Sequence, residues 1–85
     1  MNKLDLHGTP HDEVKNLTAS FIEKNLRRAS ILEVVTGHSN TMRDIVLDVL
    51  TQFNLEWYLG HGHLEGSIKV IVDDYSEYYH DYLDN

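Results

Sequence analysis

The sequence predicts a small two-layer α/β domain in which a mixed β-sheet has two helices on one face. Two stretches show the 3.6-residue apolar period of amphipathic helices, and four short stretches alternate or run apolar as β-strands do. These stretches follow one another in the order βαβαββ. The chain has 85 residues, which is enough for one domain with a small core.

The first expected strand covers residues 3–7. Its side chains alternate, so that Leu4 and Leu6 share the core face while Asp5 and His7 share the opposite, open face. Gly8 ends this strand because glycine favours a turn.

The first expected helix follows and extends to about Leu26. Thr9 is placed to cap it and Pro10 to occupy its first position, where proline is favoured. Its expected core stripe consists of Val14, Leu17, Phe21 and Ile22.

The second half of the chain repeats the strand-helix pattern and then adds two strands. Residues 31–35 are an apolar strand, residues 36–40 a loop, and residues 55–59 and 67–72 two further strands. The second helix has the clearest apolar stripe, formed by Met42, Ile45, Val46, Val49, Leu50 and Phe53. Because β-α-β crossovers are right-handed, both helices should lie on the same face of the sheet.

The charge is unevenly distributed. The formal net charge is −7, from 7 basic and 14 acidic residues, and residues 73–85 contain five of the acids and neither Lys nor Arg. Residues 1–72 therefore have 7 basic and 14 − 5 = 9 acidic residues, a net of −2. We assign residues 1–74 to the domain and residues 75–85 to an acidic, Tyr-rich tail. Nucleic-acid binders are usually basic, so binding would have to take place away from the tail.

Composition excludes several classes of protein. The chain has no cysteine, so disulfides, thiolate metal sites and cysteine nucleophiles are ruled out. No apolar run approaches the ~18–20 residues of a membrane span, and the first residues lack the apolar core of a signal peptide. We expect a cytoplasmic protein.

Four of the six histidines are expected at the edge where ligands usually bind in open α/β sheets. His7 ends the first strand, His38 follows the second, and His61 and His63 follow the third. These three strand ends lie at one edge of a sheet whose first three strands are parallel. Asp5 lies beside His7 and can orient its ring and raise its basicity. The alternative is a surface strand with two ordinary polar residues.

The loop between the second strand and the second helix is a candidate phosphate site. Backbone N–H groups at a helix N-terminus bind anions, and Gly37 allows close approach. Thr36, Ser39 and Asn40 supply polar side chains around it. The alternative is a simple turn in which Ser39 or Asn40 caps the helix.

Three kinds of side chain complete the candidate site. His61 and His63 would contact phosphate, since two histidines without a third ligand are too few for a structural metal site. Tyr58 and Lys69 are expected on the open sheet face, where they could contact bases and backbone or be merely solvent-exposed. No cofactor is required, although Asp5 could hold Mg²⁺ or Mn²⁺ in a metal-assisted reaction.

Three motifs resemble those of the Smr (small MutS-related) family. Leu4-Asp5-Leu6-His7-Gly8 is similar to the motif that opens Smr domains, Thr36-Gly37-His38 to the start of their Thr-Gly-x-Gly loop, and Gly66-Ser67 to the beginning of their last strand. The resemblance covers residues 3–72. It implies sheet order 1-2-4-3 with the last strand antiparallel, and endonuclease activity on RNA or nicking of DNA. The family's functional residues correspond to Asp5, His7, Thr36 and Gly37.

The sequence therefore predicts an endonuclease that prefers RNA. His7, oriented by Asp5, would serve as general base or acid, and His38 would contact or protonate the phosphate. Nucleic acid, and with it the ribosome, is the expected partner. The alternatives are a non-catalytic nucleic-acid or ribosome-binding module and a protein-interaction adaptor that works through the tail.

Overall fold

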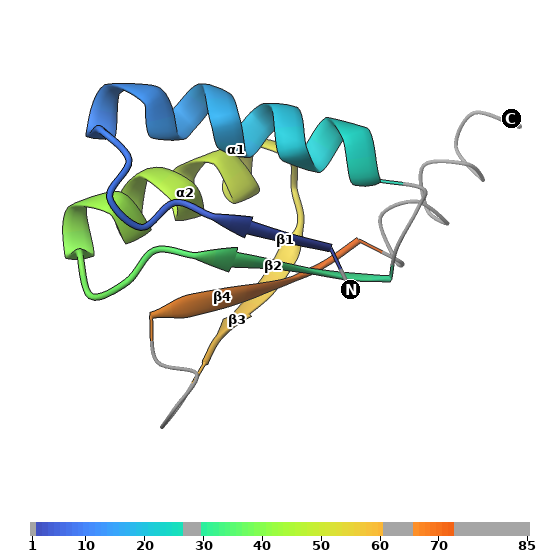
Figure 1. Ribbon diagram of the computed structural model, residues 1–85. Helices are drawn as coiled ribbons and strands as arrows, with labels where there is room; N and C mark the ends of the chain where they lie inside the picture. Colours follow the sequence, from blue (N-terminus) through green and yellow to red (C-terminus); the bar gives the residue numbers. More distant parts are fainter. Residues whose placement is uncertain (1, 27–29, 61–65, 73–85) are drawn as a thin grey trace, which may run out of the picture.

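Strands and helices alternate as predicted in the computed structural model, which describes residues 2–26, 30–60 and 66–72 (Figure 1). The elements are β1 (Asn2–Asp5), α1 (His11–Asn25), β2 (Ile31–Val35), α2 (Asn40–Gln52), β3 (Glu56–Leu59) and β4 (Ser67–Ile71). The expected histidines 61 and 63 and the tail from residue 73 lie outside the described residues.

The sheet has the order β1-β2-β4-β3, which confirms the predicted topology. β1 and β2 are parallel, whereas β4 is antiparallel to both β2 and β3. β1, β2 and β3 therefore point in one direction, and the ends of β1 and β2 lie together at one edge. Both helices cover the same face of the sheet (Figure 1).

The core lies between this face and the helices. Leu32 and Val34 of β2 are paired in register with Val70 and Ile68 of β4, and all four are buried. Burying apolar surface at roughly 25 cal/mol per Å² is the main favourable term in folding. The predicted stripe of α2 is confirmed in its buried members Met42, Val46, Val49 and Leu50, with Ile45 and Phe53 partly buried beside them.

The predicted core stripe of α1 was wrong in part. The buried line runs through Val14, Thr18 and Ile22, each four residues after the last. Leu17 is 43% exposed and Phe21 only half-buried. Successive helical residues differ by about 100°, so the line centred on Thr18 turns Leu17 to the side. The apolar pattern does not mark Thr18 as a core residue, because its hydroxyl is polar, yet Thr18 is fully buried.

The connection between β1 and α1 also differs from the prediction. β1 ends at Asp5, although the Leu6 N–H still donates to the Val35 carbonyl at 2.8 Å. A turn follows, in which the Thr9 N–H donates to the Leu6 carbonyl and Gly8 has φ +81°. α1 begins at His11 after an extended Pro10 and has no side-chain cap, so the prediction that Thr9 caps it was wrong. Because α1 begins at His11, Pro10 rather than Thr9 occupies the cap position, and proline has no side-chain oxygen that could cap the helix.

The start of α2 fits the simple alternative from the sequence. Ser39 precedes the helix, and its hydroxyl oxygen accepts a hydrogen bond from the Met42 N–H at 3.1 Å. Capping of this kind satisfies one of the N–H groups that a helix leaves unpaired. In the described part of the chain, neither helix combines the length and the apolar character that crossing a membrane requires.

Candidate functional site

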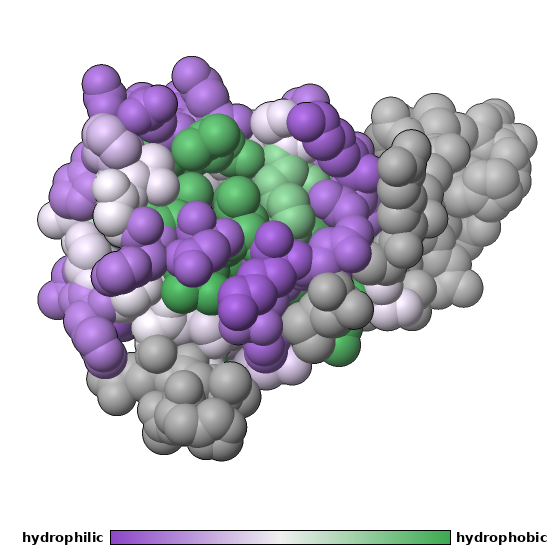
Figure 2. Space-filling view, viewed as in Figure 1, coloured by the Kyte–Doolittle hydropathy of each residue, from purple (hydrophilic) through white to green (hydrophobic). Residues whose placement is uncertain are grey.

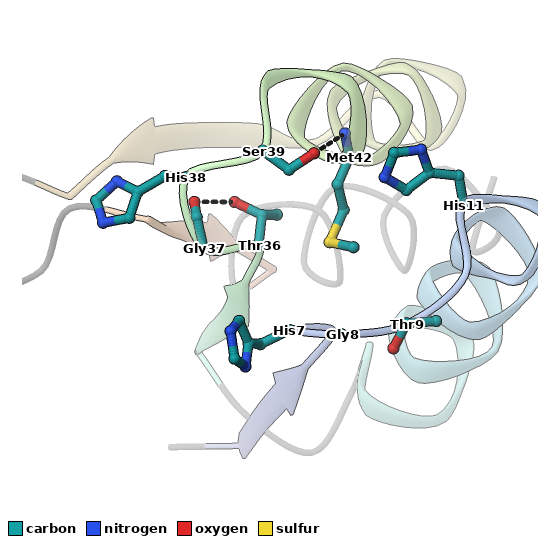
Figure 3. A pocket seen from close by; sticks show the side chains of 9 residues that line it. All are labelled: His7, Gly8, Thr9, His11, Thr36, Gly37, His38, Ser39 and Met42. Carbon is teal, nitrogen blue, oxygen red and sulfur yellow. Dashed lines mark hydrogen bonds between the residues drawn. The ribbon is translucent and has the colours of Figure 1, made fainter.

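An open groove of about 480 Å³ lies at the edge where β1 and β2 end (Figure 3). Its walls are the two turns that connect these strands to the helices. One wall consists of residues 7–9 with His11 of α1, and the other of residues 36–39 with Met42 of α2. The structure therefore brings His7, Thr36, Gly37, His38 and Ser39 together, as the sequence predicted.

The Asp5 side chain is hydrogen-bonded to the backbone of His7. Its carboxylate accepts a hydrogen bond from the backbone N–H of His7 at 2.9 Å. Asparagine and aspartate commonly bond the chain two residues on in this way, which stabilises a turn. Asp5 thus places His7 at the start of the groove through the main chain, whereas the sequence predicted a contact with the imidazole ring.

Gly66 holds the opposite wall in place. Its carbonyl oxygen accepts hydrogen bonds from the N–H groups of Thr36 (2.8 Å) and Gly37 (3.0 Å), and the Thr36 hydroxyl lies 3.2 Å away. Gly66 has φ +91°, and a Cβ placed on it would lie 3.0 Å from the Gly37 carbonyl oxygen. Only glycine fits a position that is both left-handed and this crowded.

These contacts of the Gly66 carbonyl, which we call the Gly66 clamp, determine which N–H groups of the loop remain available to a ligand. The Gly37 N–H is used within the protein. The N–H groups of Asn40 and Thr41 lie in the first turn of α2, where a helix offers no backbone acceptor. They are the donors that the loop presents to an anion, with the positive end of the helix dipole behind them.

The histidines of the groove point in different directions (Figure 3). The His7 ring lies beside the Thr36–Gly37 turn, and its Cδ2 atom is 3.5 Å from where a Cβ on Gly37 would be. The His11 ring points towards Met42. The His38 ring points outward, away from the other labelled side chains (Figure 3). His7 and His38 are exposed to solvent.

The groove differs in charge from the chain as a whole. Among the described residues, its lining contains three imidazoles and no carboxylate, although the chain has a net charge of −7. The first turn of α2 contains no acidic residue either. Within the described part of the chain, an anion in the groove would therefore meet hydrogen-bond donors and imidazoles rather than carboxylates.

Tyr58 and Lys69 lie elsewhere. They are register partners on β3 and β4, on the sheet face opposite the helices, as predicted. The Lys69 ammonium forms an ion pair with Glu33 at 2.9 Å, and its side chain is only 11% exposed. The open face thus holds this cation in a cross-strand pair, and neither residue lines the groove.

His11 is a groove residue that the sequence analysis missed. Its position in the sequence indicates only the start of a helix, yet the connection after His7 is so short that the first turn of α1 returns to the same edge. Among the described residues, no cluster of three His, Cys, Asp or Glu side chains is arranged to hold a metal ion. His61 and His63 cannot be placed relative to the groove, because they lie outside the described residues.

The fold and this site define a two-layer α/β domain with a histidine-lined groove at the ends of its parallel strands. Comparison of the chain with protein-family models, curated proteins and solved structures finds no match.

Proposed function

We propose that this domain binds the sugar-phosphate backbone of single-stranded RNA in the groove and cleaves it, acting in the cytoplasm. The observation that carries the proposal is the groove itself. Imidazoles from three different segments line it, none of its described lining residues is a carboxylate, and the free N–H groups in the first turn of α2 lie beside it. The resemblance of Asp5, His7, Thr36 and Gly37 to the Smr motifs supports the same proposal.

RNA suits this site because its own 2′-hydroxyl can serve as the nucleophile. In the proposed reaction, His7 takes the proton of the 2′-hydroxyl as the 2′-oxygen attacks the adjacent phosphorus. The bond from phosphorus to the 5′-oxygen breaks, and that oxygen leaves with a proton from a second imidazole. The products are a 2′,3′-cyclic phosphate and a 5′-hydroxyl end. No metal is needed for these steps.

The second imidazole is either His38, which the sequence favours, or His11, which Figure 3 shows turned towards the Met42 side of the groove. The N–H groups of Asn40 and Thr41 would hold the non-bridging phosphate oxygens. DNA nicking would require another nucleophile, such as water, and a metal-assisted route would draw on Asp5.

A second candidate function is binding without cleavage. It is favoured by Asp5, whose hydrogen bond goes to the main chain of His7, so that among the described residues no carboxylate is shown to orient the ring. Under this alternative the groove holds phosphate, on free RNA or on a ribosome, and the histidines contribute only charge and hydrogen bonds.

The test is cleavage of end-labelled RNA hairpins and of supercoiled plasmid, with and without EDTA. We expect RNA to be cut in EDTA and the products to end in cyclic phosphate. His7→Ala should lower the rate by about 10²–10⁴-fold, the usual contribution of a general acid or base. Separate His11→Ala and His38→Ala variants identify the proton donor, since only one of them should cause a loss of that size.

Asp5 offers a matched pair of variants. Asp5→Asn keeps an oxygen that can accept the His7 N–H and removes the charge, whereas Asp5→Ala removes both. If Asp5 acts only through the backbone, Asp5→Asn should retain most of the activity and Asp5→Ala should not. Cleavage that persists undiminished in His7→Ala would contradict the proposed site. RNA binding without any cleavage would favour the binding module.

A further inference from the structure

An apolar strip of α1 lies exposed next to the outer edge of the sheet. Leu17 and Phe21 are four residues apart and so share a side of the helix with Asn25, four residues further on. The side chains of Asn25 and Asn2 are hydrogen-bonded, which places this side of α1 over β1. Figure 2 shows the apolar surface between α1 and β1.

Among the residues that the structure describes, β1 is an edge strand, since β2 is the one strand that pairs with it. The Leu6 N–H points towards β2, where it meets the Val35 carbonyl. Because backbone groups alternate sides along a strand, the N–H and C=O groups of Lys3 and Asp5 point outward. An edge of this kind can pair with another strand.

We propose that β1 is the interface of a symmetric dimer, in which the β1 strands of two copies pair antiparallel across a two-fold axis at Leu4. In this register Lys3 of each copy lies opposite Asp5 of the other. The two residues with outward backbone groups then exchange hydrogen bonds, and their opposite charges face each other on the same sheet face. Lys3 has no ion-pair partner among the described residues of its own chain.

The strand permits few other registers. Only residues with outward backbone groups can form the hydrogen-bonded pairs, so the alternatives within β1 set Lys3 opposite Lys3 or Asp5 opposite Asp5. Like charges directly opposite each other destabilise an antiparallel pair. The pairing of Lys3 with Asp5 is thus the single register within β1 that satisfies both the backbone and the charges.

The same register joins the apolar surfaces. Leu4 lies on the helix face of β1, where it meets Leu4 of the second copy, and the two α1 helices run side by side above the joined strands. Leu17 and Phe21 of both copies would then be covered. The result is a continuous eight-stranded sheet with four helices on one face. By contrast, the outward backbone groups at the β3 edge belong to Trp57 and Leu59, which carry no charge that would select a register.

The test is the mass of the full chain in solution, measured by sedimentation velocity from about 1 µM to about 1 mM, the range of moderate to weak affinities. We expect a concentration-dependent dimer. Lys3→Asp and Asp5→Lys should each weaken it by about tenfold or more, since each places like charges opposite each other twice. The double variant Lys3→Asp/Asp5→Lys restores opposite charges and should restore dimerisation.

Two further variants keep the test independent of the charges. Leu17→Glu should weaken the dimer by about tenfold or more, because a carboxylate would enter the covered apolar surface. Lys15→Asp makes the same charge change as Lys3→Asp on the opposite side of α1 and should leave the dimer unchanged. A monomer at every concentration would overturn the proposal. So would a dimer whose affinity is unchanged by both Lys3→Asp and Leu17→Glu.

Discussion

The contact between Gly66 and Gly37 gives the sharpest prediction about stability. An alanine at position 66 would have φ +91° and would bring its Cβ within 3.0–3.2 Å of three backbone atoms of Gly37. The left-handed conformation costs about 1–2 kcal/mol and the overpacking about 1–3 kcal/mol. We therefore expect Gly66→Ala to lower the free energy of unfolding by about 2–5 kcal/mol, a large share of the ~5–10 kcal/mol of a small domain.

Gly8 supplies the matched control. It also has a positive φ, +81°, but a Cβ there would meet no atom within 4 Å. Gly8→Ala should therefore cost only the conformational part, about 1–2 kcal/mol. The difference between the two variants isolates the crowding against Gly37.

Urea unfolding followed by the fluorescence of Trp57, the one tryptophan of the chain, measures both variants. In thermal melts, each kcal/mol should lower the midpoint by about 4–8 °C for a domain of this size. If Gly66→Ala costs no more than Gly8→Ala, the clamp does not hold the loop as described.

Three further predictions concern single contacts. Thr18→Val should raise stability by about 1 kcal/mol in the same urea assay, because it keeps the shape and removes a buried hydroxyl that has no hydrogen-bond partner among the described residues; a loss of stability would show that the hydroxyl is satisfied. Ser39→Ala should cost about 1 kcal/mol by removing the cap of α2, whereas no change would mean that water replaces the cap. Glu33→Gln should lower the free energy of unfolding by about 1–2 kcal/mol, because it removes the charge that pairs with the mostly buried Lys69 ammonium. An unchanged free energy of unfolding would mean that solvent screens this ion pair.

The fold followed from local patterns that the sequence displays directly. The stripe of α2 and the apolar run of residues 31–35 each fit one period, and β2 begins and ends where the pattern does. The incorrect predictions concern α1, where the position of the helix and the packing of the core outweigh the local residue preferences. Thr9 satisfies the rule for a helix cap, yet α1 begins at His11, so that Pro10 occupies the cap position. Leu17 satisfies the apolar period, yet the line through Thr18 faces the core.

The site could be predicted only in outline. The ends of β1 and β2 must meet at one edge, so the placement of His7 and His38 near each other followed from topology. The clamp of Gly66 on residues 36–37 joins positions 30 apart in sequence, and no local pattern indicates such a backbone contact. Whether Asp5 bonds the ring or the main chain of His7 depends on where the strand ends, which sequence patterns define only to within a few residues.

We propose that nucleic acid binds in the groove rather than on the open sheet face. The most direct measurement is an NMR titration of the ¹⁵N-labelled protein with a single-stranded RNA whose 2′-hydroxyls are methylated, so that it binds without being cut. We expect the backbone amide shifts to concentrate in residues 7–11 and 36–42. Shifts centred instead on Tyr58, Lys69 and their neighbours on β3 and β4, or no shifts at all, would contradict it.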